Sequence, residues 1–230
     1  MRALALTLVL TGCATRPCLP LLNPTLWTQS SAEYRAAALQ TYTAARNALD
    51  DALATPSSRP RAVILDLDET ALDNSRFAAR MLAEGKPFSF GSDWSAWVAE
   101  SAADAIPGAQ EFLAYARSRG VTPVYITNRT TDMEAATRAN LQKLGFPLAA
   151  DTLLLRAPDG TTDKTARRDS VAARYDVLLL LGDDVNDFTP RATLTAGAPW
   201  GTRWFMLPNA IYGSWLGGTT TTPCAPSPKP

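Results

Sequence analysis

Four short apolar runs alternate with helix-like stretches through the middle of the chain, and this alternation restricts the possible folds more than any other feature of the sequence. Strands that are apolar along their whole length are buried on both faces, which is typical of parallel sheets covered by helices. The pattern therefore predicts an α/β fold with a doubly wound, Rossmann-like parallel sheet. The predicted strands are residues 62–68, 121–129, 175–184 and 202–209, and the helices between them are residues 108–119, 131–144 and 164–173.

Two further segments lie outside this alternation. Residues 31–53 are rich in alanine, with apolar side chains at helical spacing, and predict a long helix before the first strand. Residues 70–107 are rich in aromatic side chains and predict a small, mostly helical insertion after the first strand, which we call the cap. A chain of 230 residues has room for one good-sized core. The expected divisions are a signal segment at 1–12, a tether at 13–30, one domain at 31–215 and a disordered, low-complexity tail at 216–230.

The N-terminus has the pattern of a targeting segment. Arg2 precedes a run of apolar residues that is too short to span a bilayer and fits the core of a signal peptide. The sequence Leu-Thr-Gly-Cys at 10–13 resembles the bacterial lipobox, which predicts lipidation of Cys13 and attachment to a membrane through that lipid. Because Ala14 rather than aspartate follows the cysteine, the expected location is the outer membrane of a bacterial envelope. The alternative is an ordinary secretory signal that contains a cysteine.

Two cysteines remain near the ends of the mature chain. Cys18 and Cys224 are each flanked by proline, and in an oxidising envelope they are a candidate disulfide that would join the two ends. Two free thiols in the tails are the alternative.

Polar residues follow the predicted strands at the point where each strand ends. The first run ends in Asp66 and Asp68, the second in residues 127–129 (TNR) and the third in residues 182–184 (GDD), while Lys164 begins the helix before the third strand. In open parallel sheets, ligands bind at the carboxyl ends of the strands. Several carboxylates in one place require a cation, and Mg²⁺ prefers oxygen ligands. The sequence therefore predicts a magnesium site at this edge.

The composition excludes several kinds of chemistry. The chain contains no histidine, which excludes a Ser-His-Asp hydrolase, a phosphohistidine phosphatase and any metal site built on imidazole. Its formal net charge is zero, whereas proteins that bind nucleic-acid polymers usually carry a basic excess. Carboxylates, hydroxyl groups, lysine and arginine are left to carry the reaction.

These motifs, taken in order, resemble the four motifs of the haloacid-dehalogenase superfamily. The resemblance extends to the class C bacterial acid phosphatases of the lipoprotein e type and covers nearly the whole mature chain. The segments that carry it are SAEYRA (31–36), DLDETALDNS (66–75), IPGAQEFL (106–113), VYITNR (124–129), DKT (163–165), GDDVNDF (182–188) and MLPNAIYGSW (206–215).

The resemblance implies a role for each catalytic side chain. Asp66 would be the nucleophile that forms an aspartyl-phosphate. Asp68 would protonate the leaving alcohol and then activate water. Phosphatases of the superfamily have this second aspartate, whereas dehalogenases lack it, so the chain resembles the phosphatases. Thr127 would bind the transferring phosphoryl oxygens, and Lys164 would neutralise them together with the nucleophile. The two arginines one turn beyond Lys164 are alternatives for that last role.

The metal ligands follow from the same resemblance. Asp183 and Asp184 are adjacent, so their spacing alone leaves open which one contacts the metal. A capping or solvated carboxylate is the alternative for Asp184, Asp187 and Asp73, and we expect it for Asp184 and Asp73. The implied ligands of Mg²⁺ are Asp66, Asp68 through its backbone carbonyl, Asp183 and Asp187, the last either directly or through water.

Aromatic side chains of the cap and of the C-terminal motif suggest the substrate. In the class C family, matching aromatics stack on the ring of a phosphomonoester, which implies nucleoside monophosphates and aromatic phosphates. Trp97 and Phe88 are interpreted as core residues. For Trp94 and Tyr212, a role in the core and a role in substrate binding are equal alternatives. The predicted substrate-binding residues are Phe77, Trp94, Tyr212 and Asn128.

The sequence thus predicts a Mg²⁺-dependent acid phosphatase that hydrolyses phosphomonoesters, 5′-nucleotides included, through an aspartyl-phosphate. Two alternatives remain open. One is a phosphotransferase of the same fold, and the other is a non-catalytic envelope lipoprotein that binds a ligand.

Overall fold

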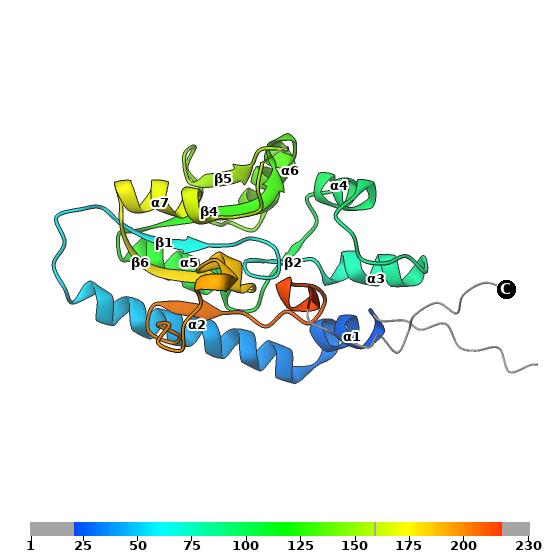
Figure 1. The fold of residues 1–230 in the computed structure, drawn as a ribbon, viewed down its shortest axis with the longest axis horizontal. Coiled ribbons are helices and arrows are strands. Elements are labelled where there is room, and N and C mark those ends of the chain that lie inside the picture. The colour runs from blue at the N-terminus through cyan, green and yellow to red at the C-terminus, as the bar shows by residue number, and fades with distance from the viewer. Residues whose placement is uncertain (1–20, 159, 218–230) are drawn as a thin grey trace, which may run out of the picture.

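A five-stranded parallel sheet forms the centre of the structure (Figure 1). The computed structural model describes residues 21–158 and 160–217 of the chain. The strand order is β5-β4-β1-β6-β7, so the first strand in the sequence lies in the middle of the sheet, and the predicted parallel α/β fold is confirmed. The strands are β1 (Arg61–Leu65), β4 (Val121–Thr130), β5 (Leu153–Arg156), β6 (Asp176–Gly182) and β7 (Trp204–Met206).

The central position of β1 brings three strand ends together. Residues 62–65 are all buried, as expected for a strand with neighbours on both sides and layers above and below. Leu65 is aligned with Tyr125 of β4 on one side and with Leu181 of β6 on the other. Since the chain continues from β1 to β4 and only later to β6, this is the switch point at which doubly wound sheets bind ligands.

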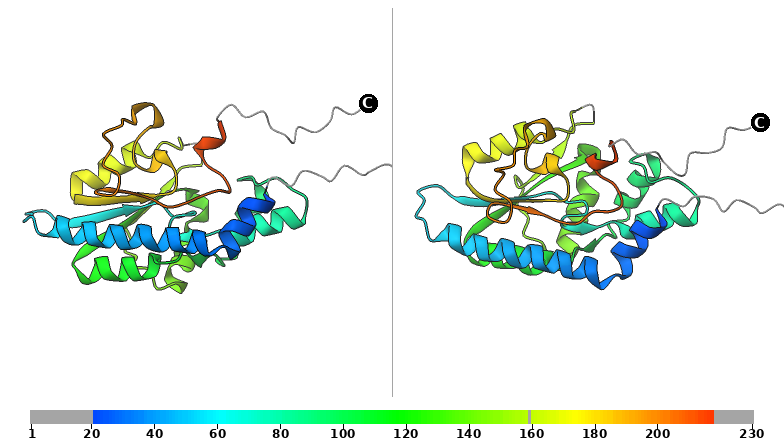
Figure 2. Two further views of the ribbon diagram at one scale, coloured as in Figure 1. Left: turned by 90° about the horizontal axis from the view of Figure 1, so that it is seen from below. Right: turned by 60° about the horizontal axis from the view of Figure 1, so that its bottom comes forward.

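Helices cover both faces of the sheet (Figure 2). The long helix α2 (Ala32–Leu53) and α5 (Ala109–Ser118) pack together on one face, and α7 (Thr165–Arg174) packs on the other. Helix α2 begins at Ser31, whose side-chain oxygen accepts the backbone N–H of Tyr34 at 3.0 Å. The turn η1 (Thr131–Met133) leads from β4 into α6 (Glu134–Lys143).

The strand β5 has no counterpart among the sequence predictions. It pairs with β4 at the edge of the sheet, with Leu154 opposite Ile126. Only the first of its four residues is fully buried, so its apolar run is short and weak. Its conformation depends on pairing with β4 more than on a pattern of its own.

The chain enters the cap after the end of β1 and leaves the cap close to the point where it entered. Its two ends are joined by a short antiparallel pair, β2 (Leu72–Asp73) and β3 (Asp104–Ala105). Between them lie the helices α3 (Ser75–Ala83) and α4 (Ser92–Ala99), which stand beside the carboxyl end of β1 in Figure 1. The cap therefore places its aromatic side chains next to the strand ends.

The N-terminal part of the structure corrects one prediction. Residues 22–30, expected to belong to the tether, form the helix α1 (Leu22–Ser30), which packs against α3. Its buried residues include Thr25 and Thr28, so the sequence shows no apolar stripe that would have predicted a helix. The signal segment, Cys13, Cys18 and Cys224 lie outside the described residues, as does the tail from residue 218. Within the described part of the chain, every helix is too short or too polar to cross a membrane.

Candidate active site

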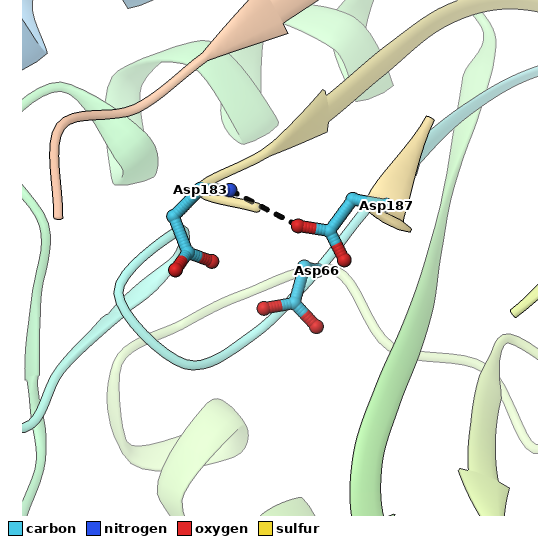
Figure 3. Close-up of side chains that lie close together, drawn as sticks. All are labelled: Asp66, Asp183 and Asp187. Atoms are coloured by element: carbon cyan, nitrogen blue, oxygen red, sulfur yellow. Dashed lines mark hydrogen bonds between the residues drawn. The ribbon is translucent and has the colours of Figure 1, made fainter. Parts of the chain in front are cut away.

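Three of the predicted carboxylates converge at the carboxyl edge of the sheet. Asp66 directly follows β1, and its backbone N–H donates to the carbonyl of Leu181 on β6 at 3.0 Å. Asp183 follows β6, and Asp187 ends the turn η2 (Val185–Asp187). Figure 3 shows the three side chains close together, and one carboxylate oxygen of each lies within 4.8 Å of the others.

A tight backbone turn holds Asp187 over the end of β6. Its Oδ2 atom accepts the N–H of Asp183 at 3.1 Å, drawn as a dashed line in Figure 3, and the N–H of Asp184 at 2.9 Å. A Cβ atom at position 182 would collide with the side chain of Asp187, so this close approach requires Gly182. The GDDVND motif is therefore a loop shaped to bring two carboxylates together.

Lys164 lies between two of these carboxylates. It immediately precedes α7, its side chain is buried, and its Nζ donates to Asp66 and, at 2.6 Å, to Asp187. Burial alone would lower the pKa of Lys164, but Asp187 and Asp66 together raise it, so the ammonium stays charged. Burial raises the pKa of Asp66, whereas Lys164 acts in the opposite direction and favours the ionised carboxylate.

The two arginines after Lys164 have other partners. Arg167 donates to the backbone carbonyl of Thr127 at 2.6 Å and to the side-chain oxygen of Asn128 at 2.7 Å. Arg168 donates to the carbonyl of Asn186 at 2.9 Å. Lys164 is therefore the cation that contacts the predicted nucleophile.

Asp183 is half-buried beside the other carboxylates and has only neutral hydrogen-bond partners among the described residues. Its oxygens accept hydrogen bonds from Thr70 Oγ1 at 3.0 Å and Asn209 Nδ2 at 2.8 Å, and no salt bridge reaches it within the described residues. Burial, followed by the charges of Asp187 and Asp66, raises its pKa well above the usual range. A cluster of three carboxylates with one lysine suits an additional hard cation such as Mg²⁺, so the donor set fits the expected metal.

Asp184 and Asp73 instead accept hydrogen bonds from backbone N–H groups. Asp184 accepts the N–H groups of Asn186 and Ser214, and these hydrogen bonds lower its pKa although burial acts to raise it. Asp73 accepts the N–H of Ser75 at 2.8 Å at the start of α3. Of the adjacent pair at 183–184, the structure thus turns Asp183 toward the carboxylate cluster.

Asp68 is held by Arg129, which the sequence places at the same edge of the sheet but without a predicted role. The guanidinium of Arg129 donates to both oxygens of Asp68, at distances from 2.7 to 3.1 Å, and the arginine side chain is 1% exposed. Asn74 Nδ2 donates to Asp68 Oδ1 at 2.9 Å. One signal was available, since Arg129 and Thr127 are two residues apart on one strand and so share a face.

The two remaining polar residues of this strand end differ in exposure. Thr127 is fully buried, and its Oγ1 accepts the N–H of Arg129 at 3.1 Å. Asn128 is exposed at the cleft, where its Nδ2 donates to the carbonyl of Thr162 at 3.0 Å.

A cleft of about 930 Å³ opens over the carboxylates, and aromatic side chains form part of its wall. Tyr212 stacks on Phe88 with ring centroids 4.7 Å apart, and it meets Phe90 edge-to-face at 5.1 Å. Trp94 also lines the cleft, with the guanidinium of Arg129 5.6 Å from its ring centroid. The aromatic wall, defined here as Phe90, Trp94 and Tyr212, therefore adjoins the Asp68–Arg129 pair.

Phe77 is a correction to the predicted substrate-binding set. It is fully buried inside the cap, where it packs against Trp94 at 5.3 Å and Phe88 at 5.1 Å, and it does not line the cleft. Phe90, which the sequence analysis did not select, is 59% exposed and does line it. Periodicity did not separate the two, because the burial of each depends on how α3 and α4 pack.

Glu69 is a buried acidic residue for which the sequence predicted no role. It is 2% exposed, and burial together with the charge of Asp68 raises its pKa to about 8. Its carboxyl group contacts Tyr212 and Asn74.

The site consists of an aspartate at the end of the central strand, a lysine in contact with it and a carboxylate loop after a neighbouring strand, an arrangement typical of the haloacid-dehalogenase superfamily. A family model described as "HAD superfamily, subfamily IIIB (Acid phosphatase)" matches residues 17–215. The chain therefore belongs to this acid phosphatase family, and the comparisons indicate phosphomonoesterase activity.

Solved structures of a class C acid phosphatase from Bacillus anthracis are similar along most of their length. One has 35% sequence identity and a TM-score of 0.80, and a second, with tungstate bound, has 34% identity and a TM-score of 0.78. Each match covers 86% of both chains. A stem 28 kDa glycoprotein of Glycine max is 29% identical over 123 residues, which is 50% of this chain and 46% of that protein, so the match spans about half of each.

Proposed function

We propose that this acid phosphatase hydrolyses aromatic phosphomonoesters, 5′-nucleotides among them, in a Mg²⁺-dependent reaction that passes through an aspartyl-phosphate on Asp66. The observation that carries the proposal is the cleft itself, in which the carboxylate–lysine cluster and the aromatic wall face the same space. A phosphoryl group placed at Asp66 would leave its ester group beside Phe90, Trp94 and Tyr212.

The metal would be held by the side chains of Asp66 and Asp183, the backbone carbonyl of Asp68, and Asp187 directly or through water. When bound, Mg²⁺ would supply positive charge that offsets the phosphoryl oxygens and the neighbouring carboxylates.

The protein's own groups would act in two steps. Asp66 would attack phosphorus as its bond to the ester oxygen breaks, and Asp68 would give its proton to that oxygen so that a neutral alcohol leaves. Asp68 would then take a proton from water, whose oxygen attacks phosphorus and releases inorganic phosphate from Asp66. Lys164 and the hydroxyl of Thr127 would stabilise the charge on the phosphoryl oxygens in both steps.

The bidentate contact from Arg129 suits the acid–base role of Asp68. It fixes the position of the Asp68 carboxyl group, which is not among the three carboxylates close enough together to share a metal within the described residues. Tungstate is a tetrahedral oxyanion like phosphate, and its presence in the Bacillus anthracis enzyme supports a phosphate site in this family.

We also propose that the enzyme acts in a bacterial envelope, anchored by lipid at Cys13 on the outer membrane. The support is the lipobox-like sequence at 10–13.

A single set of assays tests the proposed reaction. Purified protein would be given p-nitrophenyl phosphate, 5′-AMP or glycerol phosphate, with Mg²⁺ and then with EDTA. We expect hydrolysis that EDTA abolishes and Mg²⁺ restores, and full activity in EDTA after dialysis would contradict the metal requirement. Adding an alcohol acceptor distinguishes the phosphotransferase alternative, which would yield a new phosphate ester in place of free phosphate.

A further inference from the structure

The hydroxyl group of Tyr212 is held from the other side of the active site. Tyr212 follows β7 in a segment without regular structure, and its hydroxyl donates a hydrogen bond to Oε2 of Glu69, 143 residues earlier in the chain. Glu69 lies in the turn directly after Asp68, so this bond joins the aromatic wall to the loop that follows β1.

The second oxygen of Glu69 is also occupied. It accepts the backbone N–H of Asn74 at 3.0 Å. The side chain of Asn74 in turn donates to Asp68 at 2.9 Å and accepts the indole N–H of Trp97 at 2.8 Å. Glu69 is not part of the carboxylate cluster that could hold a metal within the described residues. Its carboxyl group therefore serves contacts inside the protein.

Keeping a glutamate at this position is energetically unfavourable. A nearly inaccessible acidic side chain next to Asp68 is costly to bury unless its contacts compensate. The backbone of Glu69 is also left-handed, with φ at 60°, a conformation that residues other than glycine rarely adopt. The contacts that offset these costs are those to Tyr212 and Asn74.

We propose that Glu69 is a positioning residue that sets substrate specificity by fixing the ring of Tyr212 in the orientation that stacks on an aromatic ester group. This inference rests on the proposed function, in which Tyr212 contacts the substrate ring. Phe88 supports one face of Tyr212, and the bond from Glu69 stops the ring from turning out of the wall. The acid–base group depends little on Glu69, because Asp68 keeps its own hydrogen bonds to Arg129 and Asn74.

Substitutions on both sides of the contact test the inference. Glu69→Ala removes the acceptor, and Tyr212→Phe removes the donor but keeps the ring. We expect each variant to raise KM for 5′-AMP about 3- to 10-fold, the effect of one anchoring hydrogen bond, with a much smaller effect on kcat and on glycerol phosphate. Glu69→Gln should stay close to the wild type, because its oxygen can accept from Asn74 while its amide donates to Tyr212.

The double variant gives the decisive comparison. If the two side chains act through one contact, Glu69→Ala combined with Tyr212→Phe should be no more than about 2-fold worse than the more affected single variant. Tyr115→Phe is the matched control, because Tyr115 also donates to a carboxylate, that of Asp50, away from the cleft. It should leave all kinetic constants unchanged.

The experiment distinguishes failure of the positioning role from failure of the proposed function. Losses that multiply in the double variant, equal losses on 5′-AMP and glycerol phosphate, or a Glu69→Gln variant as impaired as Glu69→Ala would each overturn the positioning role. If the wild-type enzyme itself does not prefer ring-bearing phosphates, the proposed substrate class is wrong and this inference falls with it.

Discussion

Replacing Asp183 with asparagine should stabilise the protein when metal is absent. The three clustered carboxylates have only Lys164 as a cationic partner, and Asp183 is the one without a salt bridge among the described residues. An asparagine fits the same contacts, because its oxygen can accept from Asn209 while its amide donates to Thr70, whose hydroxyl can rotate.

The size of the effect follows from the geometry. Two unit charges 4.8 Å apart repel by about 3.5 kcal/mol at an effective dielectric constant of about 20. Lys164 already offsets part of the charge on Asp66 and Asp187, so this repulsion is an upper bound. We therefore expect Asp183→Asn to increase the free energy of unfolding by about 1–3 kcal/mol in EDTA.

Magnesium should cancel or reverse this difference in stability. A ligand at 100 times its dissociation constant stabilises the native state by about 2.7 kcal/mol, and the wild type should gain a stabilisation of this kind while Asp183→Asn gains little. Urea unfolding of both proteins, in EDTA and in saturating Mg²⁺, measures all four values. Asp184→Asn is the matched control: the amide offers one acceptor oxygen where the carboxylate offers two, so the N–H of either Asn186 or Ser214 loses its acceptor and stability should fall by a similar amount in both conditions. A destabilised Asp183→Asn in EDTA, or an equal gain from Mg²⁺ in both proteins, would refute the reasoning.

Three other predictions concern the reaction and the anchor. Asp66→Asn should abolish turnover and Asp68→Asn should slow it by roughly 10²- to 10⁴-fold, the usual contribution of an acid–base group; a phosphoryl label trapped on a serine or threonine, and not on Asp66, would contradict the mechanism. Tyr212→Ala should reduce kcat/KM for 5′-AMP by about 5- to 150-fold, as expected for one lost stacking partner, and hardly affect glycerol phosphate; equal losses on both substrates would make the role of Tyr212 structural. Cys13→Ser should release the protein from membranes or block its processing, and a processed variant that still fractionates with membranes would exclude a lipid anchor at this residue.

The sequence alone determined the architecture and which charged side chains lie together at the strand ends. Both depend on local patterns. A continuous apolar run such as that before Asp66 can be buried only in the middle of a covered parallel sheet, and the strand ends of such a sheet meet at one edge. The positions of Asp66, Asp183 and Lys164 therefore followed once the order of strands and helices was assigned.

Only the tertiary structure decided which of several similar side chains is buried and which lines the cleft, and whether a weak apolar run forms a strand. Packing placed Phe77 in the core of the cap and Phe90 on the cleft, although both are phenylalanines in the same aromatic segment. Pairing with β4 gave residues 153–156 a strand conformation that their short run did not predict.

The polar contacts of the site were the least predictable from the sequence. Arg129 reaches Asp68 across 61 residues of sequence, and Tyr212 reaches Glu69 across 143. No local spacing encodes such pairs, because a buried polar group needs a partner but the chain offers many that could serve. The pairing of β4 with β1 selects the first pair, and the position of the C-terminal segment beside the end of β1 selects the second.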